Sequence, residues 1–399
     1  MSYLDKLLDG VEVEWKPLGE FAELSRGKTI TAKTKNEGNI PVISGGQTPA
    51  YYNSEFNRDG ETITIAGSGA YAGFVMYWNE PIYVSDAFSV KPDLTILNTR
   101  YVFHFLLSNQ TRIHNLQKGS GVPHVYPKDL AKIQIPIPCP ENPEKSLAIQ
   151  KEIVRILDIF TELTTELTTE LTTELTVRKE QYNYYREEFF NFDKGTVVWM
   201  SLGEIGEFQR GKRFVRTDIT SDGVPCIHYG EMYTHYGTWA NESKSFLSEE
   251  LVDNKKLRVA EKGDVVIVAA GETVEDIGKG TAWLSDKGVV IHDACFSYRS
   301  QLNPKYVAYF TRTKRFHDQI KKHISSGKIS AINANGLSKA IIPIPSPDEQ
   351  ERIVAILDKF DTLTTSISKG LPKEIALRQK QYEYYRDMLL TFPTDNIEA

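Results

Sequence analysis

The segment IVRILDIFTELTTELTTELTTELTVRKEQYNYYRE, residues 153–187, decides the fold. Its apolar residues recur at helical spacing, and nothing breaks this pattern until about Phe192. Upstream, Asn142 followed by Pro143 fits a helix N-cap with proline at the first helical position. We therefore expect one helix of about 50 residues, about 75 Å long at about 1.5 Å per residue. A helix of this length needs a partner that covers its apolar residues.

The middle of this helix is a four-residue repeat, TELTTELTTELTTELT (161–176). Four residues turn about 400° on an ideal helix, so the leucine stripe drifts about 40° per unit. An ordinary amphipathic helix of low complexity explains such a repeat by itself. Its place between two duplicated regions suggests that it is a spacer, since one unit changes their separation by about 6 Å. The spacer leucines are Leu163, Leu167, Leu171 and Leu175.

Both ends of this segment occur again, 200 positions further along the chain. IVRILDIF (153–160) returns as IVAILDKF (353–360), and QYNYYRE (181–187) returns as QYEYYRD (381–387). The second copy begins at a capping box with proline, SPDE, and a later Gly-Leu-Pro divides it into two helices. The natural partner of each helical copy is the other copy, packed through an a/d-like seam of tyrosine, phenylalanine and leucine.

The regions before the helices are also copies of each other. VEVEWKPLGEFAELSRGK (11–28) returns as TVVWMSLGEIGEFQRGK (196–212), and IPIP precedes each helical region. Short alternating runs such as ETITIAG (61–67) and DVVIVAAG (264–271) predict strands, so we expect an α+β chain with two mixed, mostly β heads. The predicted order is a first head (1–140), a central long helix (141–194), a second head (195–345) and a C-terminal helical region (346–399).

The composition is that of a globular protein with 399 residues, of which 40% are hydrophobic and 25% charged. The net charge of −6 argues at first against nucleic acid, because affinity for phosphates comes mainly from lysine and arginine. However, 12 acidic and only 7 basic residues lie between Glu141 and Lys194. The excess acidity therefore belongs to the helical segment, and the heads remain candidates for nucleic-acid binding.

Targeting and redox signals are absent from the sequence. MSYLDKLLDG lacks the layout of a signal peptide, and no apolar run approaches the about 20 residues of a membrane helix. We expect a cytoplasmic protein without membrane contact. Cys139, Cys226 and Cys295 form no CxxC pair, so we expect reduced thiols and neither a disulfide framework nor a zinc site.

These features together resemble the DNA-specificity (S) subunit of a type I restriction-modification system, of the kind with four-residue spacer repeats. The motifs that carry the resemblance are IPIP, LGE at the opening of each head, both helical motifs with their copies, and the repeat. The resemblance covers essentially the whole chain. It implies that each head is a target recognition domain reading one half of a split double-stranded DNA site with a fixed gap. It also implies that the helices form an antiparallel, coiled-coil-like pair.

The resemblance also implies where the chemistry lies. In this family, two modification subunits dock around the helices, hold S-adenosylmethionine and methylate an adenine in each half-site. Restriction subunits, expected here in two copies, add cleavage that depends on ATP and Mg. YLDKLLDGVEVEW (3–15) resembles the segment near FFNFDKGTVVW (189–199), so the C-terminal helix would complete the first repeat. This circular arrangement brings the termini together and relates the heads by a pseudo-twofold axis.

Candidate DNA contacts are basic or polar residues at equivalent places in the two heads. The Arg-Gly-Lys copies suit phosphate binding, and the glycine-rich KGSGVPHVY (118–126) and SSGKISAIN (325–333) let the backbone approach DNA closely. Further polar loops follow IPVI (40–43) and VPCI (224–227). Solvated charge or a plain turn is the alternative for each. The candidates are Arg26, Lys28, Gln47, Lys118, Ser120, His124, Arg210, Lys212, Arg213, His228, Tyr229, Lys328, Ser330 and Asn333.

The Tyr-Tyr-Arg copies on the helices are candidate contacts for partner subunits. Tyrosine and arginine also suit nucleic acid, but a surface kept alike in both halves suits two identical protein partners. The heads, in contrast, diverge, as two different DNA half-sites require. The candidates are Tyr182, Tyr184, Tyr185, Arg186, Tyr382, Tyr384, Tyr385 and Arg386.

Catalytic motifs are missing from the sequence. It has no NPPY-type tetrapeptide of adenine methyltransferases, no GxxxxGK[ST] loop and no HExxH. GSGAYAG (67–73) favours a tight strand connection, and the recurring Asp86 and Asp293 suit structural hydrogen bonds. We predict no catalytic residue, metal or cofactor in this chain. The alternatives are a free-standing bipartite DNA-binding protein and a single-chain nuclease or methyltransferase with unrecognised motifs.

Overall fold

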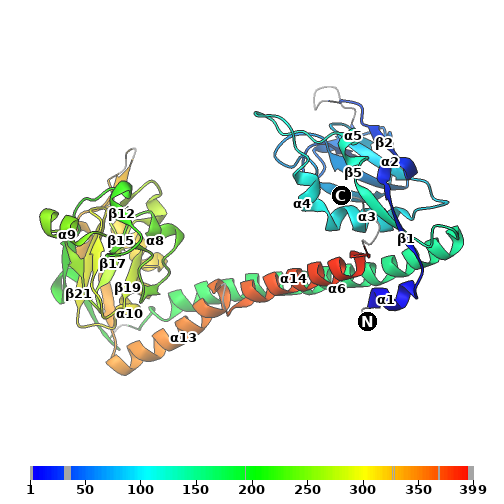
Figure 1. Ribbon diagram of the computed structural model, residues 1–399. Helices are drawn as coiled ribbons and strands as arrows, with labels where there is room; N and C mark the ends of the chain where they lie inside the picture. The colour runs from blue at the N-terminus through cyan, green and yellow to red at the C-terminus, as the bar shows by residue number, and fades with distance from the viewer. Residues whose placement is uncertain are drawn as a thin grey trace. The chain divides into compact units, whose positions relative to one another are not determined.

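The chain folds into two compact units (Figure 1). The computed structural model describes residues 3–30, 37–193, 195–325, 327, 329–366 and 369–393. Unit 1 contains Met1–Leu171 and Ile375–Ala399, and unit 2 contains Thr172–Glu374. Each unit holds one head and one pair of helices.

The first head is built from two small sheets and a ribbon. Its four-stranded antiparallel sheet has the order β2-β8-β5-β6, and its three-stranded sheet β4-β3-β7 contains one parallel pair, β3 with β7. The ribbon joins β1 to β9. The strands are β1 (Val13–Pro17), β2 (Ala22–Arg26), β3 (Ile40–Ile43), β4 (Tyr51–Asn53), β5 (Glu61–Ala66), β6 (Val75–Asn79), β7 (Tyr83–Val84), β8 (Ala87–Pro92) and β9 (Gln134–Pro138). The helices of this part are α1 (Tyr3–Leu8), α2 (Leu18–Phe21), α3 (Thr99–Ser108), α4 (Gln110–His114) and α5 (Pro127–Leu130).

The second head repeats this topology with additions. The order β11-β21-β17-β19 matches that of the first head, and β14 extends it parallel to β19. β13 and β20 match the parallel pair of β3 and β7, and β10 with β23 forms the ribbon. The strands are β10 (Val198–Ser201), β11 (Gly206–Arg210), β12 (Ile219–Thr220), β13 (Val224–Ile227), β14 (Trp239–Ala240), β15 (Ser245–Leu247), β16 (Val259–Ala260), β17 (Val265–Val268), β18 (Ala270–Gly271), β19 (Gly280–Trp283), β20 (Val289–Ile291), β21 (Cys295–Ser300), β22 (Ser330–Ala331) and β23 (Ile341–Ile344). The helical elements are α7 (Leu202–Ile205), η1 (Arg216–Asp218), α8 (Glu231–Thr234), α9 (Glu249–Lys255), η2 (Val274–Asp276), α10 (Pro304–Phe310), α11 (Lys314–Lys321) and α12 (Ala334–Ser338). The predicted duplication is therefore confirmed at the level of strand order.

The central helix α6 (Pro143–Glu188) has 46 residues and begins where the sequence predicts. The Asn142 side chain accepts a hydrogen bond from the backbone N–H of Lys145 at 3.0 Å, as an N-cap does. The helix ends at Glu188, before Phe192, because Phe190 turns into the core of the second head, where its ring centroid lies 4.8 Å from that of Tyr306. The division between the units falls inside the repeat, after Leu171.

The second helical copy is indeed divided, into α13 (Pro347–Thr365) and α14 (Leu371–Leu390). Ser346 caps α13 by accepting from the backbone N–H of Glu349. Gly370 is required at the junction, since a Cβ atom there would lie 2.5 Å from the carbonyl oxygen of Thr362. The glycine break and the N-cap at Ser346 are therefore confirmed, whereas the Glu349 side chain binds Arg352 at 2.7 Å and is not seen to complete the predicted capping box.

Each unit contains an antiparallel pair of helices. In unit 1, α6 packs on α14: the Phe160 ring stacks on Tyr385 at 5.2 Å, and Thr161 donates to the Tyr382 hydroxyl at 3.1 Å. In unit 2, the same motifs meet with exchanged roles. Tyr185 of α6 stacks on Phe360 of α13 at 5.5 Å. Every IVRILDIF-type copy therefore packs against a QYNYYR-type copy, and the predicted antiparallel pairing is confirmed.

Two of the four repeat leucines are more exposed than an apolar stripe covered by a partner would be, while Leu171 and Leu175 are partly buried. Leu163 is 48% exposed and Leu167 39%, whereas Thr164 and Thr168 are partly buried. The drift of a four-residue stripe around the helix explains this result, because no straight partner can follow it. Cover by the partner helix, which we expected, is wrong for Leu163 and Leu167.

Both ends of the chain complete unit 1. Leu4 and Leu8 of α1 lie in the same hydrophobic core as Leu389, Leu390 and Phe392. The predicted meeting of the termini is therefore present within this unit. The three cysteines are free and buried, as expected for thiols that serve packing.

Candidate nucleic-acid interface

One carboxylate of the helix anchors each head, at the same place in both copies. Asp158 of α6 accepts bonds from Arg100 at 2.5 Å and lies 2.8 Å from His104 Nε2. Burial alone would raise the pKa of Asp158, but its bonds to Arg100 and His104 outweigh this and lower the pKa. In unit 2, Asp358 accepts from Lys305 and Tyr309, both at 2.7 Å. These bonds fix how α3 and α10 sit on the helices, and with them the loops described next.

The Arg-Gly-Lys segments lie directly against the backbone of a turn, between β7 and β8 in the first head and between β20 and β21 in the second. A Cβ atom on Gly27 would lie 2.3 Å from the carbonyl oxygen of Ser85, and one on Gly211 would lie 2.2 Å from that of His292. Only glycine permits such an approach. The recurrence of Arg-Gly-Lys is thus explained: the glycine allows close packing, and the flanking cations remain at the surface, with Arg26 and Arg210 both exposed.

The turn before β8 in the first head, and before β21 in the second, forms the second segment of the candidate DNA face. Gly27 N–H donates to Ala87 O at 2.9 Å and Lys28 N–H to Val84 O at 3.0 Å, so the two bonds bracket Ser85 and Asp86. In the second head, Gly211 N–H donates to Cys295 O at 3.0 Å, and Arg210 Nε to the Asp293 carbonyl at 2.9 Å. Basic side chains and an acidic turn are therefore held side by side in both heads.

The glycine-rich loop of the first head closes against the same turn. Lys118 and His124 exchange backbone hydrogen bonds at 2.9 Å, and Val125 N–H donates to Gly67 O at 3.1 Å. Lys118 Nζ forms an ion pair with Asp129 at 2.7 Å and remains 58% exposed. Ser120 is exposed at the tip of this loop. GSGAYAG (67–73) connects β5 to β6, as expected. Its Gly67 also accepts the backbone bond that holds the glycine-rich loop in place.

In the corresponding loop of the second head, the candidate residues have other contacts. Ile332 N–H donates to Ala269 O at 2.8 Å, which matches the bond between Val125 and Gly67. Ser330 is buried in β22. The Asn333 side chain caps α12 by accepting from Gly336 N–H at 2.8 Å. These two side chains already serve the fold, and Lys328 lies outside the described residues.

The loops after β3 and β13 complete the face. In the first head a Cβ atom on Gly45 would lie 2.4 Å from Ser68 O, and Gln47 is exposed beside it. In the second head, the His228 ring lies 4.9 Å from that of His292 and 4.6 Å from that of Tyr229. Burial lowers the pKa of both histidines, so the neutral form is favoured in the free chain. Lys212 donates to the Lys255 carbonyl at 3.3 Å, and Arg213 is exposed.

In the first head, the Arg-Gly-Lys segment, the acidic turn and the glycine-rich loop line a polar cavity of about 270 Å³. Arg26, Asp86, His124 and Tyr126 are among its lining residues. Arg26 lies over the Tyr126 ring at 5.6 Å, and the His124 and Tyr126 rings stack at 6.1 Å. The structure thus brings together Arg26 and His124, which the sequence placed 98 positions apart.

The Tyr-Tyr-Arg candidates divide into packed and exposed members. Tyr182 is buried against Phe360, and Arg186 lies over the Tyr182 ring at 5.2 Å. Tyr184 is 61% exposed and Tyr384 66%. The remaining candidates, Tyr185, Tyr382, Tyr385 and Arg386, lie in or beside the seam through the contacts Tyr185–Phe360, Thr161–Tyr382, Phe160–Tyr385 and Arg386–Tyr382. Tyr184 and Tyr384 are therefore the members with the largest free surface.

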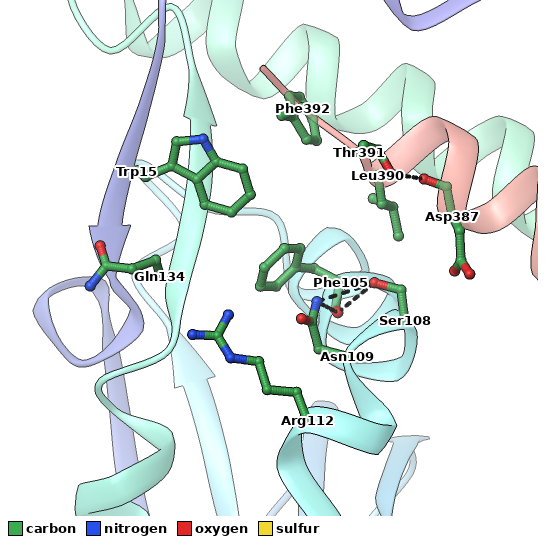
Figure 2. Close-up of a pocket in the computed structure, with 10 residues that line it drawn as sticks. All are labelled: Trp15, Phe105, Ser108, Asn109, Arg112, Gln134, Asp387, Leu390, Thr391 and Phe392. Carbon is green, nitrogen blue, oxygen red and sulfur yellow. Dashed lines mark hydrogen bonds between the residues drawn. The ribbon is translucent and has the colours of Figure 1, made fainter. Parts of the chain in front are cut away.

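A second cavity, of about 450 Å³, lies where the first head meets the end of α14 (Figure 2). Trp15 and Phe105 form one side, Arg112 projects toward them, and Leu390 and Phe392 come from the C-terminal segment. Trp15 Nε1 donates to the carbonyl oxygen of Pro393 at 2.9 Å. This cavity takes in none of the candidate DNA contacts.

Sequence reasoning missed two residues of the candidate face. His292 contacts Phe214, His228 and Tyr229, and Tyr126 contacts Arg26 and His124. His292 begins HDAC (292–295), which resembles SDAF (85–88) of the first head. Its alignment with SDAF, directly opposite the Arg-Gly-Lys copies, was the signal that could have identified it.

Comparison with known proteins decides the family. The model of the family described as "Type I restriction modification DNA specificity domain" matches residues 10–177 and 194–377. This chain belongs to that family. The specificity subunit of the type I restriction enzyme EcoR124I/EcoR124II of Escherichia coli is 35% identical, with 98% of each chain covered. A Haemophilus influenzae protein described as a putative type I restriction enzyme specificity subunit is 34% identical, also with 98% of each chain covered.

The family assignment agrees with the fold. A solved chain from a study of complex assembly in the type I restriction-modification system matches with a TM-score of 0.66 at 16% identity, covering 95% of this chain and 97% of that one. The two matched ranges of the specificity domain correspond to the two copies found in the sequence. Within the described residues, no helix is long and apolar enough to span a membrane, and no group of three or more His, Cys, Asp or Glu side chains could hold a metal ion.

Proposed function

We propose that the two heads read the two halves of a bipartite DNA site with a fixed gap, and that this chain directs adenine methylation and restriction by partner subunits. The observation that carries the proposal is the repeated face: in each head an Arg-Gly-Lys segment, an acidic turn and a third loop converge through equivalent backbone bonds. The side chains on these frames differ between the heads, as two different half-sites require.

The chemistry belongs to the partners in this proposal. Two modification subunits bind S-adenosylmethionine, and two restriction subunits use ATP and Mg, while this chain, acting in the cytoplasm, contributes sequence recognition and no catalytic residue. Membership of a family whose named relatives are subunits of restriction enzymes supports this division. A free-standing DNA-binding protein has no support in the comparisons.

The proposed docking points of the modification subunits are the exposed Tyr184 and Tyr384, which occupy equivalent positions on the two helix pairs. Large exposed aromatic residues on otherwise polar helices are typical of protein interfaces. The similarity of the two positions supports two identical partners.

Co-purification tests the proposal. The full chain, co-expressed with the modification subunit of its system, should be recovered with two copies of that subunit. Adenine methylation should appear only when both proteins are present, and methylome sequencing should give two short motifs separated by a constant gap. Methylation or cleavage by the purified chain alone, or a single continuous motif, contradicts the proposal.

A further inference from the structure

The acidic turn in the middle of each basic face lacks an explanation in phosphate binding. Asp86 is exposed, and the Asp293 side chain is 38% exposed. Each lies beside an arginine that the proposed function assigns to DNA. A carboxylate repels phosphates, so its recurrence at this place requires another role.

A role of Asp86 and Asp293 in holding the turn would not by itself require their negative charge. The Ser68 hydroxyl donates to Asp86 Oδ2. Asp293 has a different neighbour, His292, whose Nδ1 lies 3.0 Å from Asp293 Oδ1. The two aspartates therefore lie in corresponding turns but have different hydrogen-bond partners. What they share is a turn held by equivalent backbone bonds at its ends, from Gly27 and Lys28 in the first head and from Gly211 and Lys212 in the second. The second turn is one residue longer, since Gly67 N–H donates to Asp86 O whereas Ala269 N–H donates to Ala294 O.

We infer that Asp86 and Asp293 each accept a hydrogen bond from the exocyclic amino group of a base, cytosine N4 or adenine N6, in the half-site read by their own head. This inference rests on the proposed function and adds specificity-determining residues to it. A carboxylate only accepts hydrogen bonds and has about four lone-pair sites, so Asp86 retains free acceptor capacity beside Ser68. In the major groove, the amino groups of cytosine and adenine are the base donors that a carboxylate can use.

Arg26 and Arg210 lie beside the two aspartates and would contact the same half-sites. Arg210 is held by its bond from Nε to the Asp293 carbonyl, and Arg258 Nη1 supports the Arg210 carbonyl at 2.6 Å. Arg26 lies with Asp86 along the wall of the same cavity. Arginine pairs with guanine or phosphate, and the carboxylate selects an amino-bearing base next to it. The aspartate thereby supplies discrimination, and the arginine supplies most of the affinity.

The test is the substitution Asp86→Asn in the full chain, assembled with its modification subunit. An amide can donate as well as accept, so the keto-bearing base at the same position should become acceptable. We expect one position of the first half-site to lose about tenfold to a hundredfold of its discrimination against thymine in place of cytosine, or guanine in place of adenine. Which exchange occurs identifies the base. The second half-site serves as the internal control and should be unchanged.

Two further variants separate the inference from a structural effect. Ser68→Ala removes the hydrogen bond to Asp86 but keeps the carboxylate, so base preference should be retained. Asp293→Asn should relax one position of the second half-site only, and it tests the idea independently if Asp86→Asn does not fold. Unchanged preferences in both Asn variants, or equal changes in Asp86→Asn and Ser68→Ala, overturn the inference while the wild type still reads two half-sites. A wild type without a bipartite motif instead contradicts the proposed function.

Discussion

Gly27 and Gly211 allow close packing within the two candidate DNA faces, because each leaves room for a neighbouring backbone. Alanine at Gly27 would place Cβ within 2.4 Å of Val84 O, so the chain has to shift and the Arg-Gly-Lys segment moves with it. We expect Gly27→Ala to cost about 1–3 kcal/mol of unfolding free energy. It should also weaken binding to the first half-site.

The matched control is Gly121→Ala. No atom lies within 4 Å of a Cβ at Gly121, so its unfolding free energy should stay close to that of the wild type. Urea denaturation followed by circular dichroism measures both variants. Equal stability of Gly27→Ala and Gly121→Ala would show that the close approach is not tight in solution.

The buried His104 makes unit 1 sensitive to acid. Burial lowers the pKa of His104, and the opposing bond to Asp158 does not restore it. An unfolded histidine titrates near about 6.5, so the unfolded state takes up the proton first. The stabilisation is therefore complete above about pH 6.5 and is lost as the pH falls through the lower pKa of the folded state.

The second unit suggests the variant that tests this pH dependence. Tyr309 takes the place of His104 there and donates to Asp358. We expect His104→Tyr to lose less stability than the wild type between pH 8 and pH 5.5, measured by urea denaturation. The same loss in both proteins would assign the acid sensitivity to other groups.

At the level of elements, the helix carboxylates clamp the heads. Asp358 binds Lys305 and Tyr309 of α10 and is partly exposed. Asp358→Ala should lower the unfolding free energy of unit 2 by about 1–2 kcal/mol, because two donors lose their acceptor. Glu351→Ala, at an exposed position of the same helix, should change it by less than about 0.5 kcal/mol. Thermal unfolding of both variants measures the difference, and similar values would contradict a clamp.

The elements were largely predictable from the sequence because their signals are local. The N-caps at Asn142 and Ser346, the break at Gly370 and the alternating strands require only neighbouring residues. The duplication then predicted that the two halves share a topology. The exposure of Leu163 was not predicted, since it depends on how a drifting stripe meets its partner helix.

The candidate site was predictable only in part, because convergence of loops is a tertiary property. Arg26 and His124 were both selected from the sequence, but nothing in it showed that they share a cavity. The side chain of Asn333 resembled a polar contact in the sequence, and in the structure it caps α12. His292 was missed because its neighbours Phe214 and His228 lie in loops that follow other strands, β11 and β13.

At the scale of the whole molecule, the repeat is the candidate spacer between half-sites. Deleting one unit, residues 169–172, removes about 6 Å and about 40° of helix. On B-DNA with about 3.4 Å per base pair, we expect the preferred gap to change by one or two base pairs. Methylome sequencing of the assembled enzyme gives the gap directly. Glu170→Gln, which keeps the length, should leave it unchanged, and an unchanged gap after the deletion rejects the spacer role.

The participation of both chain ends in unit 1 has a consequence for biosynthesis. Unit 2 ends at Glu374, whereas the core of unit 1 includes Leu389, Leu390 and Phe392. During translation, therefore, unit 1 is the first to be synthesised, but its core is completed only after unit 2. Until Leu389, Leu390 and Phe392 emerge, the nascent first half presents an apolar surface around Leu4 and Ile153 that holdase chaperones can bind. A chain that terminates before Leu389 should leave that surface open and be degraded by proteases, although all of unit 2 has been translated.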